Sequence, residues 1–189
     1  PETGSSTAAN LLHELATKRN VTRVWTGGDH FEAQWSLGHY PYGDWVEKYE
    51  KPLLVTTTRN PLARLTSYAA KHHSCKGTSV ALRFWGSRDS DVILKRLDEI
   101  WITERYNESR VAFALRFRLG LGDVLPPLAK FHRRTLEGRC KMSTDLEIER
   151  EVRDLASKRL DATLAEIDPR LVTIFSTYLD LAMSLGRTR

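Results

Sequence analysis

The order of apolar and polar positions along this chain predicts an α/β fold. Helical spacing predicts a first helix over residues 6–18, whose apolar face carries Leu11, Leu12, Leu15 and Ala16. The β-branched stretch 21–25 predicts a short strand that ends at a glycine pair. Residues 52–58 are the strongest predicted strand, because an apolar segment that continues into β-branched residues is typical of a buried parallel strand. Pro61 suits the first turn of a helix that continues to residue 73.

The second half of the chain is predicted to be mostly helical. The expected helices cover residues 90–106, 125–134, 144–167 and 171–185. Residues 111–117 fit either a strand or a helix, and Asp168-Pro169 marks a turn or a helix start. No linker-like stretch separates these elements, so residues 1–189 are expected to form a single domain with a parallel sheet flanked by helices.

Charge and composition narrow the classes of function. The chain has 29 basic and 24 acidic residues, and the net charge of +5 favours anionic partners such as nucleotides or sulfated glycans. The basic residues are scattered and match no nucleic-acid-binding motif, so no nucleic-acid partner is expected. No apolar run reaches the ~18 residues of a membrane helix. Two cysteines alone do not define a metal site, so no metal is expected.

Two features favour a secretory location. Cys75 and Cys140 fit either one disulfide or two free thiols, because the sequence alone does not decide between them. N-glycosylation triplets begin at Asn20 and at Asn107. Together they favour the Golgi lumen or another secretory compartment, with the cytoplasm as the alternative.

The first segment that suggests chemistry is residues 1–7, with the sequence PETGSST. It places a glycine and several hydroxyls at a helix start, where free backbone N–H groups and the helix dipole favour an anion. The same residues also suit a simple helix cap. They do not form a Walker A loop, and no other part of the chain matches that motif. The missing motif disfavours a kinase-like nucleotide enzyme.

The second such segment, residues 59–68, begins where the strongest predicted strand ends, and open α/β sheets bind ligands at that place. Arg59 can hold a phosphate with its guanidinium fork, and Ser67, about two helical turns on, can add a hydroxyl donor. Arg64 is expected to pair with a carboxylate or to anchor the helix. Standing alone, the segment would also fit an ordinary helix start with arginine salt bridges.

Taken in order, these segments resemble the sulfotransferases that use 3′-phosphoadenosine 5′-phosphosulfate (PAPS), and within them the carbohydrate or Golgi-type branch. Residues 1–7 are similar to the family's Pro-Lys-Thr-Gly-Ser/Thr-Ser/Thr loop for the 5′-phosphosulfate. Residues 38–43 look like its Gly-His-x-Pro-x-Gly segment. The element that binds the 3′-phosphate is matched by Arg59, Pro61, Arg64, Ser67 and Tyr68.

The resemblance implies a P-loop-like sulfotransferase fold and a role for each matching residue. The residues that would cradle the 5′-phosphosulfate are Thr3, Gly4, Ser5, Ser6 and Thr7. Arg59 and Ser67 would bind the 3′-phosphate of PAPS and of the spent donor, adenosine 3′,5′-bisphosphate (PAP). His39 would be the general base, with His30 as the alternative. The implied reaction is sulfuryl transfer from PAPS to a hydroxyl of a carbohydrate or of another hydroxylated acceptor.

Two departures from the family pattern keep a second function open. Glu2 stands where the family has a lysine beside the leaving group, and a glutamate there would repel the phosphosulfate. The family's first strand would lie before Pro1, so this chain is expected to lack it. The alternative function is therefore a catalytically impaired protein that binds a nucleotide or glycan. Trp85, Trp101 and Tyr106 either stack on sugar rings or belong to the core.

Overall fold

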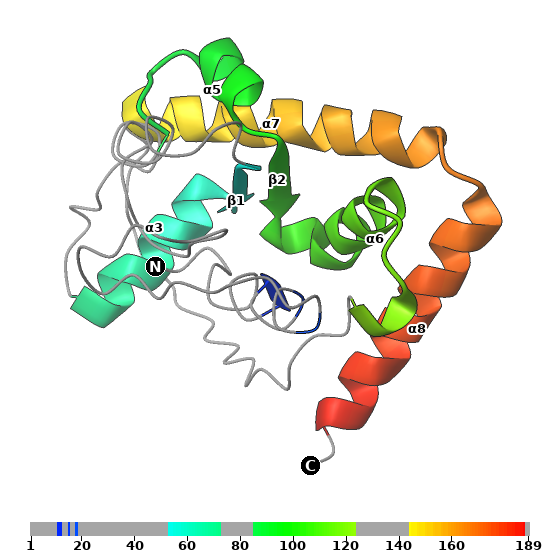
Figure 1. Cartoon of the computed structure of the whole chain (residues 1–189). Coiled ribbons are helices and arrows are strands. Elements are labelled where there is room, and N and C mark those ends of the chain that lie inside the picture. The colour runs from blue at the N-terminus through cyan, green and yellow to red at the C-terminus, as the bar shows by residue number, and fades with distance from the viewer. Residues whose placement is uncertain are drawn as a thin grey trace.

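The computed structural model describes residues 11, 12, 15, 18, 53–72, 85–123 and 144–187. Within these residues the chain is a mixed α/β protein with a small parallel sheet and mostly helical content (Figure 1), which confirms the expected α/β class. The strands are β1 (Val55–Thr58) and β2 (Glu99–Ile102). The helices are α3 (Pro61–His72), α5 (Ser90–Arg96), α6 (Tyr106–Arg116), α7 (Thr144–Ala165) and α8 (Pro169–Arg187), and 3₁₀ turns cover Thr103–Arg105 and Leu121–Asp123. The predictions for residues 21–25 and 125–134 lie outside the described residues.

The two strands pair in parallel, with Val55 opposite Glu99 and Thr58 opposite Ile102. Parallel strands need a crossover connection, and the chain passes through α3 and α5 before it reaches β2. The beginnings of the strands are tied together, because the Leu54 N–H donates to the Asp98 carboxylate at 2.8 Å. Both carboxyl ends therefore lie at the same edge of the sheet, from which α3 and the turn after β2 depart.

Three helices agree closely with the predictions made from local sequence signals. α3 begins at Pro61 as predicted, and the Asn60 side chain caps it by accepting from the Ala63 N–H at 3.0 Å. The helix predicted over 144–167 is α7, which ends two residues earlier. α8 begins at Pro169, since the Asp168 carboxylate accepts from the Arg170 N–H at 2.9 Å and caps the first turn. The interpretation of Asp168-Pro169 as a helix start is thus confirmed.

The prediction of one helix over residues 90–106 is wrong beyond residue 96. α5 ends at Arg96, and Leu97 is already extended, with φ −102° and ψ 122°. The next residues, 99–102, form β2, because pairing with β1 satisfies their backbone groups and buries the bulky Trp101 and Ile102. Residues 111–117, which fitted a strand or a helix, are helical as far as Arg116.

α6 is surrounded by the core on three sides. It contacts β2, α7 and α8, and α7 also contacts α3 and α5 (Figure 1). Towards α7 the buried residues are Ile102, Ala112, Ala156 and Leu160. Towards α8 they are Val111, Ala114, Phe175 and Leu179. On the third side Leu11 packs against Trp101 and Phe113, with Leu12 and Leu15 beside them, as the predicted apolar face of the first helix requires.

Two features of the sequence acquire a structural meaning in this core. Trp85 and Trp101 are 2% and 0% exposed, so both are core residues and neither presents a face to a sugar.

Asn107 lies in α6, where its Nδ2 donates to the Asp180 carboxylate at 2.7 Å, and Ser109 of the same triplet is buried. A glycan on Asn107 would replace this exposed contact, and the location of the protein stays a prediction. No helix of the described segments is long and apolar enough to cross a membrane.

Candidate functional site

Arg59 and Ser67 meet at the carboxyl edge of the sheet. Arg59 directly follows β1, and Ser67 lies about two turns into α3. The Arg59 Nη1 and the Ser67 Oγ are 3.4 Å apart, in a partly buried position. A distance of 3.4 Å is long for a hydrogen bond, and both groups can donate, so both can turn to one shared acceptor such as a phosphate oxygen. The structure therefore brings together the two residues that the sequence predicted for the 3′-phosphate.

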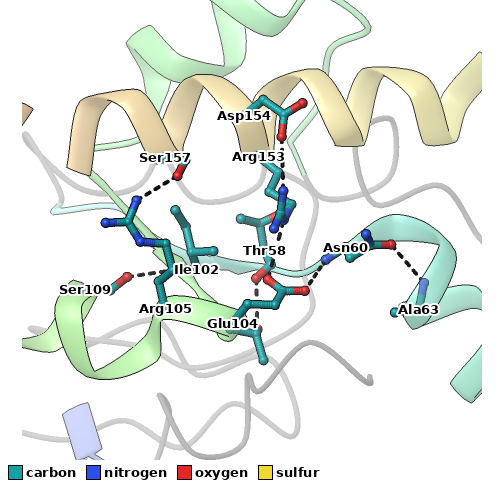
Figure 2. Close-up of polar contacts among 11 residues, drawn as sticks. Thr58, Asn60, Ala63, Ile102, Glu104, Arg105, Ser109, Arg153, Asp154 and Ser157 are labelled. Carbon is teal, nitrogen blue, oxygen red and sulfur yellow. Dashed lines mark hydrogen bonds and ion pairs between the residues drawn. The ribbon is translucent and has the colours of Figure 1, made fainter. Parts of the chain in front are cut away.

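The turn that carries Arg59 is held from both sides by the segment after β2 (Figure 2). The Thr103 hydroxyl donates to the Thr58 carbonyl at 2.8 Å, and the Asn60 N–H donates to Glu104 Oε1 at 2.6 Å. These bonds fix the residues before and after Arg59. The sequence analysis does not identify Thr103 and Glu104, because their proximity to the turn depends on β2, which the helical pattern of residues 90–106 conceals.

Glu104 also connects this turn to α7. Its Oε2 lies 3.5 Å from Arg153 Nε, and Arg153 in turn lies 3.0 Å from the Asp154 carboxylate (Figure 2). Arg105 reaches the same helix through Ser157 Oγ at 2.8 Å. Arg153 therefore lies between the carboxylates of Glu104 and Asp154, and the turn that carries Arg59 is connected to α7 through Glu104 and Arg105.

Arg64 forms a buried ion pair that fixes α3 on α7. Its Nη2 lies 2.7 Å from Glu149 Oε2, and the two residues are 7% and 2% exposed. The expectation that Arg64 pairs with a carboxylate is confirmed. Arg64 therefore anchors the helix that carries Ser67, one turn away, rather than presenting its charge to solvent.

The other predicted site residues lie outside the described residues, and their roles stay predictions. They are Glu2, Thr3, Gly4, Ser5, Ser6, Thr7, His30 and His39, together with Cys75 and Cys140. Tyr68 lies in α3. Among the described residues, no group of three or more His, Cys, Asp or Glu side chains is arranged to hold a metal ion.

The described residues form a mixed α/β protein that has an arginine and a serine in contact at the carboxyl edge of a parallel sheet. A comparison of the chain with protein-family models, with curated proteins and with solved structures finds no match. The family resemblance of residues 1–7, 38–43 and 59–68 therefore stays a prediction.

Proposed function

We propose that this protein is a PAPS-dependent sulfotransferase with a P-loop-like fold, acting on a hydroxyl of a carbohydrate or of another hydroxylated acceptor. The observation that carries the proposal is the 3.4 Å approach of Arg59 Nη1 to Ser67 Oγ. It lies at the carboxyl edge of a parallel strand, where α/β sheets bind nucleotides. The position of this pair after two further matching segments supports the same function.

In the proposed reaction, the acceptor oxygen attacks the sulfur of PAPS. The bond between sulfur and the bridging oxygen breaks, PAP leaves with that electron pair, and His39 takes the proton of the acceptor hydroxyl. Backbone N–H groups and hydroxyls of residues 3–7 stabilise the charge on the departing 5′-phosphate. Arg59 and Ser67 hold the opposite end of the nucleotide, so their part is to orient the donor for in-line attack.

The proposal is tested by calorimetric titration with PAP and, separately, with adenosine 5′-phosphate, which lacks the 3′-phosphate. We expect micromolar affinity for PAP and much weaker binding of adenosine 5′-phosphate. Ser67→Ala should weaken PAP binding by about fivefold, since it removes one neutral hydrogen bond of about 1 kcal/mol. Ser184→Ala, an exposed hydroxyl on α8, is the matched control. No binding of PAP at millimolar concentration would refute the nucleotide site and the enzyme with it.

A second candidate function, nucleotide or glycan binding without turnover, is favoured by Glu2. A carboxylate beside the phosphosulfate repels the donor and cannot neutralise the leaving group. Turnover of labelled PAPS with a panel of glycan acceptors separates the two functions, because only the active enzyme transfers the label.

We expect Glu2→Lys to tighten PAP binding by about tenfold, since it replaces a repulsive charge with a charge-assisted hydrogen bond. The measurement is the same titration, followed by the transfer assay. Glu151→Lys, an exposed residue of α7, controls for the change in net charge. Equal or weaker binding in Glu2→Lys would show that residue 2 does not face the phosphosulfate.

A further inference from the structure

A cluster of buried hydrogen-bond donors lies on α6 and β2, apart from the residues of the proposed site. Arg110 is 0% exposed, and its Nε, Nη1 and Nη2 all lack a hydrogen-bond partner among the residues that the structure describes. The same holds for the hydroxyl of Tyr106 and for the indole Nε1 of Trp101. Buried polar atoms are nearly always paired in proteins, so five unpaired ones on three neighbouring residues need an explanation.

The three side chains are in contact with one another. The rings of Trp101 and Tyr106 meet edge to face with centroids 5.7 Å apart, and the Arg110 Cζ lies 5.6 Å from the centre of the Tyr106 ring. Tyr106 and Arg110 are one turn apart on α6 and therefore share a face. The next residue of that face, Phe113, packs on Trp101 at 5.1 Å and belongs to the cluster with Leu11.

All three residues act as donors at neutral pH. Burial lowers the pKa of Arg110 to about 10, against an opposing electrostatic influence of Tyr106, so the guanidinium remains charged at neutral pH. Burial also raises the pKa of the Tyr106 hydroxyl, which therefore keeps its proton. The indole N–H of Trp101 can only donate. The stacking of Arg110 on Tyr106 compensates part of the charge but pairs none of the N–H groups.

Three carboxylates on β2, α6 and α8 are already engaged by other residues. Glu108 pairs with Arg105, Glu99 pairs with Arg116, and Asp180 accepts from Asn107. A positive charge at 0% exposure without a counter-ion is strongly unfavourable. Among the described residues, the cluster therefore has no negatively charged acceptor for its donors.

We propose that Arg110, Tyr106 and Trp101 form a buried binding site for a small oxyanion such as sulfate or phosphate. A guanidinium fork suits two oxygens of such an ion, and the phenol and indole add neutral donors to the others. The site is closed, so uptake requires local opening of the packing over α6, and exchange of the ion is expected to be slow. The inference does not depend on the proposed sulfotransferase function.

The test is thermal unfolding in sulfate and in chloride of matched ionic strength, after long incubation. Arg59→Ala serves as the background, so that the proposed nucleotide site does not contribute. Arg110→Met is made in this background, and Arg150→Met, at an exposed position of α7, is the control. The general stabilisation by sulfate is common to all variants and cancels in the comparison.

We expect the order of the melting temperatures of the background and of Arg110→Met to differ between chloride and sulfate. In chloride, Arg110→Met should melt at or above the background, because it removes an uncompensated buried charge. In sulfate at about one hundred times Kd, the background should gain roughly 5 °C more than Arg110→Met. Arg150→Met should respond to sulfate as the background does.

Two results would overturn the proposal. An equal response to sulfate in the background and in Arg110→Met would show that no ion binds there. A similar loss of stability by Arg110→Met in both salts would show that a carboxylate of this chain pairs with Arg110. If Arg110→Met does not fold, a second measurement tests the site: the NMR resonance of the Trp101 indole N–H. This resonance is assigned by its absence from the spectrum of Trp101→Phe. It should shift as sulfate is added to the background, and an unchanged resonance would exclude the site.

Discussion

Arg64→Met is expected to lower the free energy of unfolding by about 3–5 kcal/mol, the usual effect of breaking a buried ion pair by removing one partner. Arg64 and Glu149 are almost fully buried, and their charged atoms are 2.7 Å apart. Methionine fills much of the same volume but takes the arginine charge away from the buried Glu149 carboxylate. The loss should appear in urea denaturation as a lower midpoint with an unchanged slope.

Two further variants distinguish this effect from a loss of packing. Arg64→Met/Glu149→Leu should recover most of the stability, because replacing both charges by apolar groups leaves neither charge uncompensated. Arg170→Met breaks the exposed pair with Asp168 at 2.8 Å and should change stability far less. A double variant as unstable as Arg64→Met would mean that the arginine acts through its packing and not through its charge.

Arg59→Ala is expected to weaken PAP binding by about a hundredfold. The change removes a charge-assisted, two-pronged contact to the 3′-phosphate, and such contacts contribute about 1.5–3 kcal/mol. The remaining hydroxyl of Ser67, 3.4 Å away, cannot replace a positive charge. Calorimetric titration measures the loss, and Arg150→Ala, an exposed arginine of α7, is the control for a change in net charge.

The nucleotide without the 3′-phosphate gives this prediction a second readout. Arg59→Ala should bind PAP and adenosine 5′-phosphate with similar affinity, because the contact that distinguishes them is gone. Unchanged discrimination between the two nucleotides in Arg59→Ala would place the 3′-phosphate against other residues. The nucleotide-binding function could then stand, but the site at the carboxyl edge of β1 could not.

The elements that the sequence predicted correctly are those with strong local signals. β1 combines apolar and β-branched residues, and Pro61 and Asn60 mark the start of α3 through a fixed φ and a side-chain cap. Asp168 and Pro169 mark the start of α8 in the same way. The meeting of Arg59 and Ser67 was predictable as well, because it depends on a spacing of eight residues across one strand end and two helical turns.

The element that the sequence did not predict is β2. Residues 97–102 continue the helical pattern of α5 closely enough to be taken for one helix, and only the partner strand makes them extended. That partner is distant in the chain: Val55 pairs with Glu99. The prediction therefore also missed Thr103 and Glu104, whose bonds to Thr58 and Asn60 hold the turn that carries Arg59.

Local signals over a few residues thus predict β1, the starts of α3 and α8, the approximate extent of α7, and the spacing of Arg59 and Ser67. Tertiary packing decides everything that depends on a distant partner. It gives Arg64 its counter-charge 85 residues away, and it makes Trp85 and Trp101 core residues. It also buries Arg110 beside Tyr106, where no described residue accepts a hydrogen bond from the guanidinium. The physical reason is that helix and turn preferences act between near neighbours, whereas burial and charge pairing depend on which elements pack together.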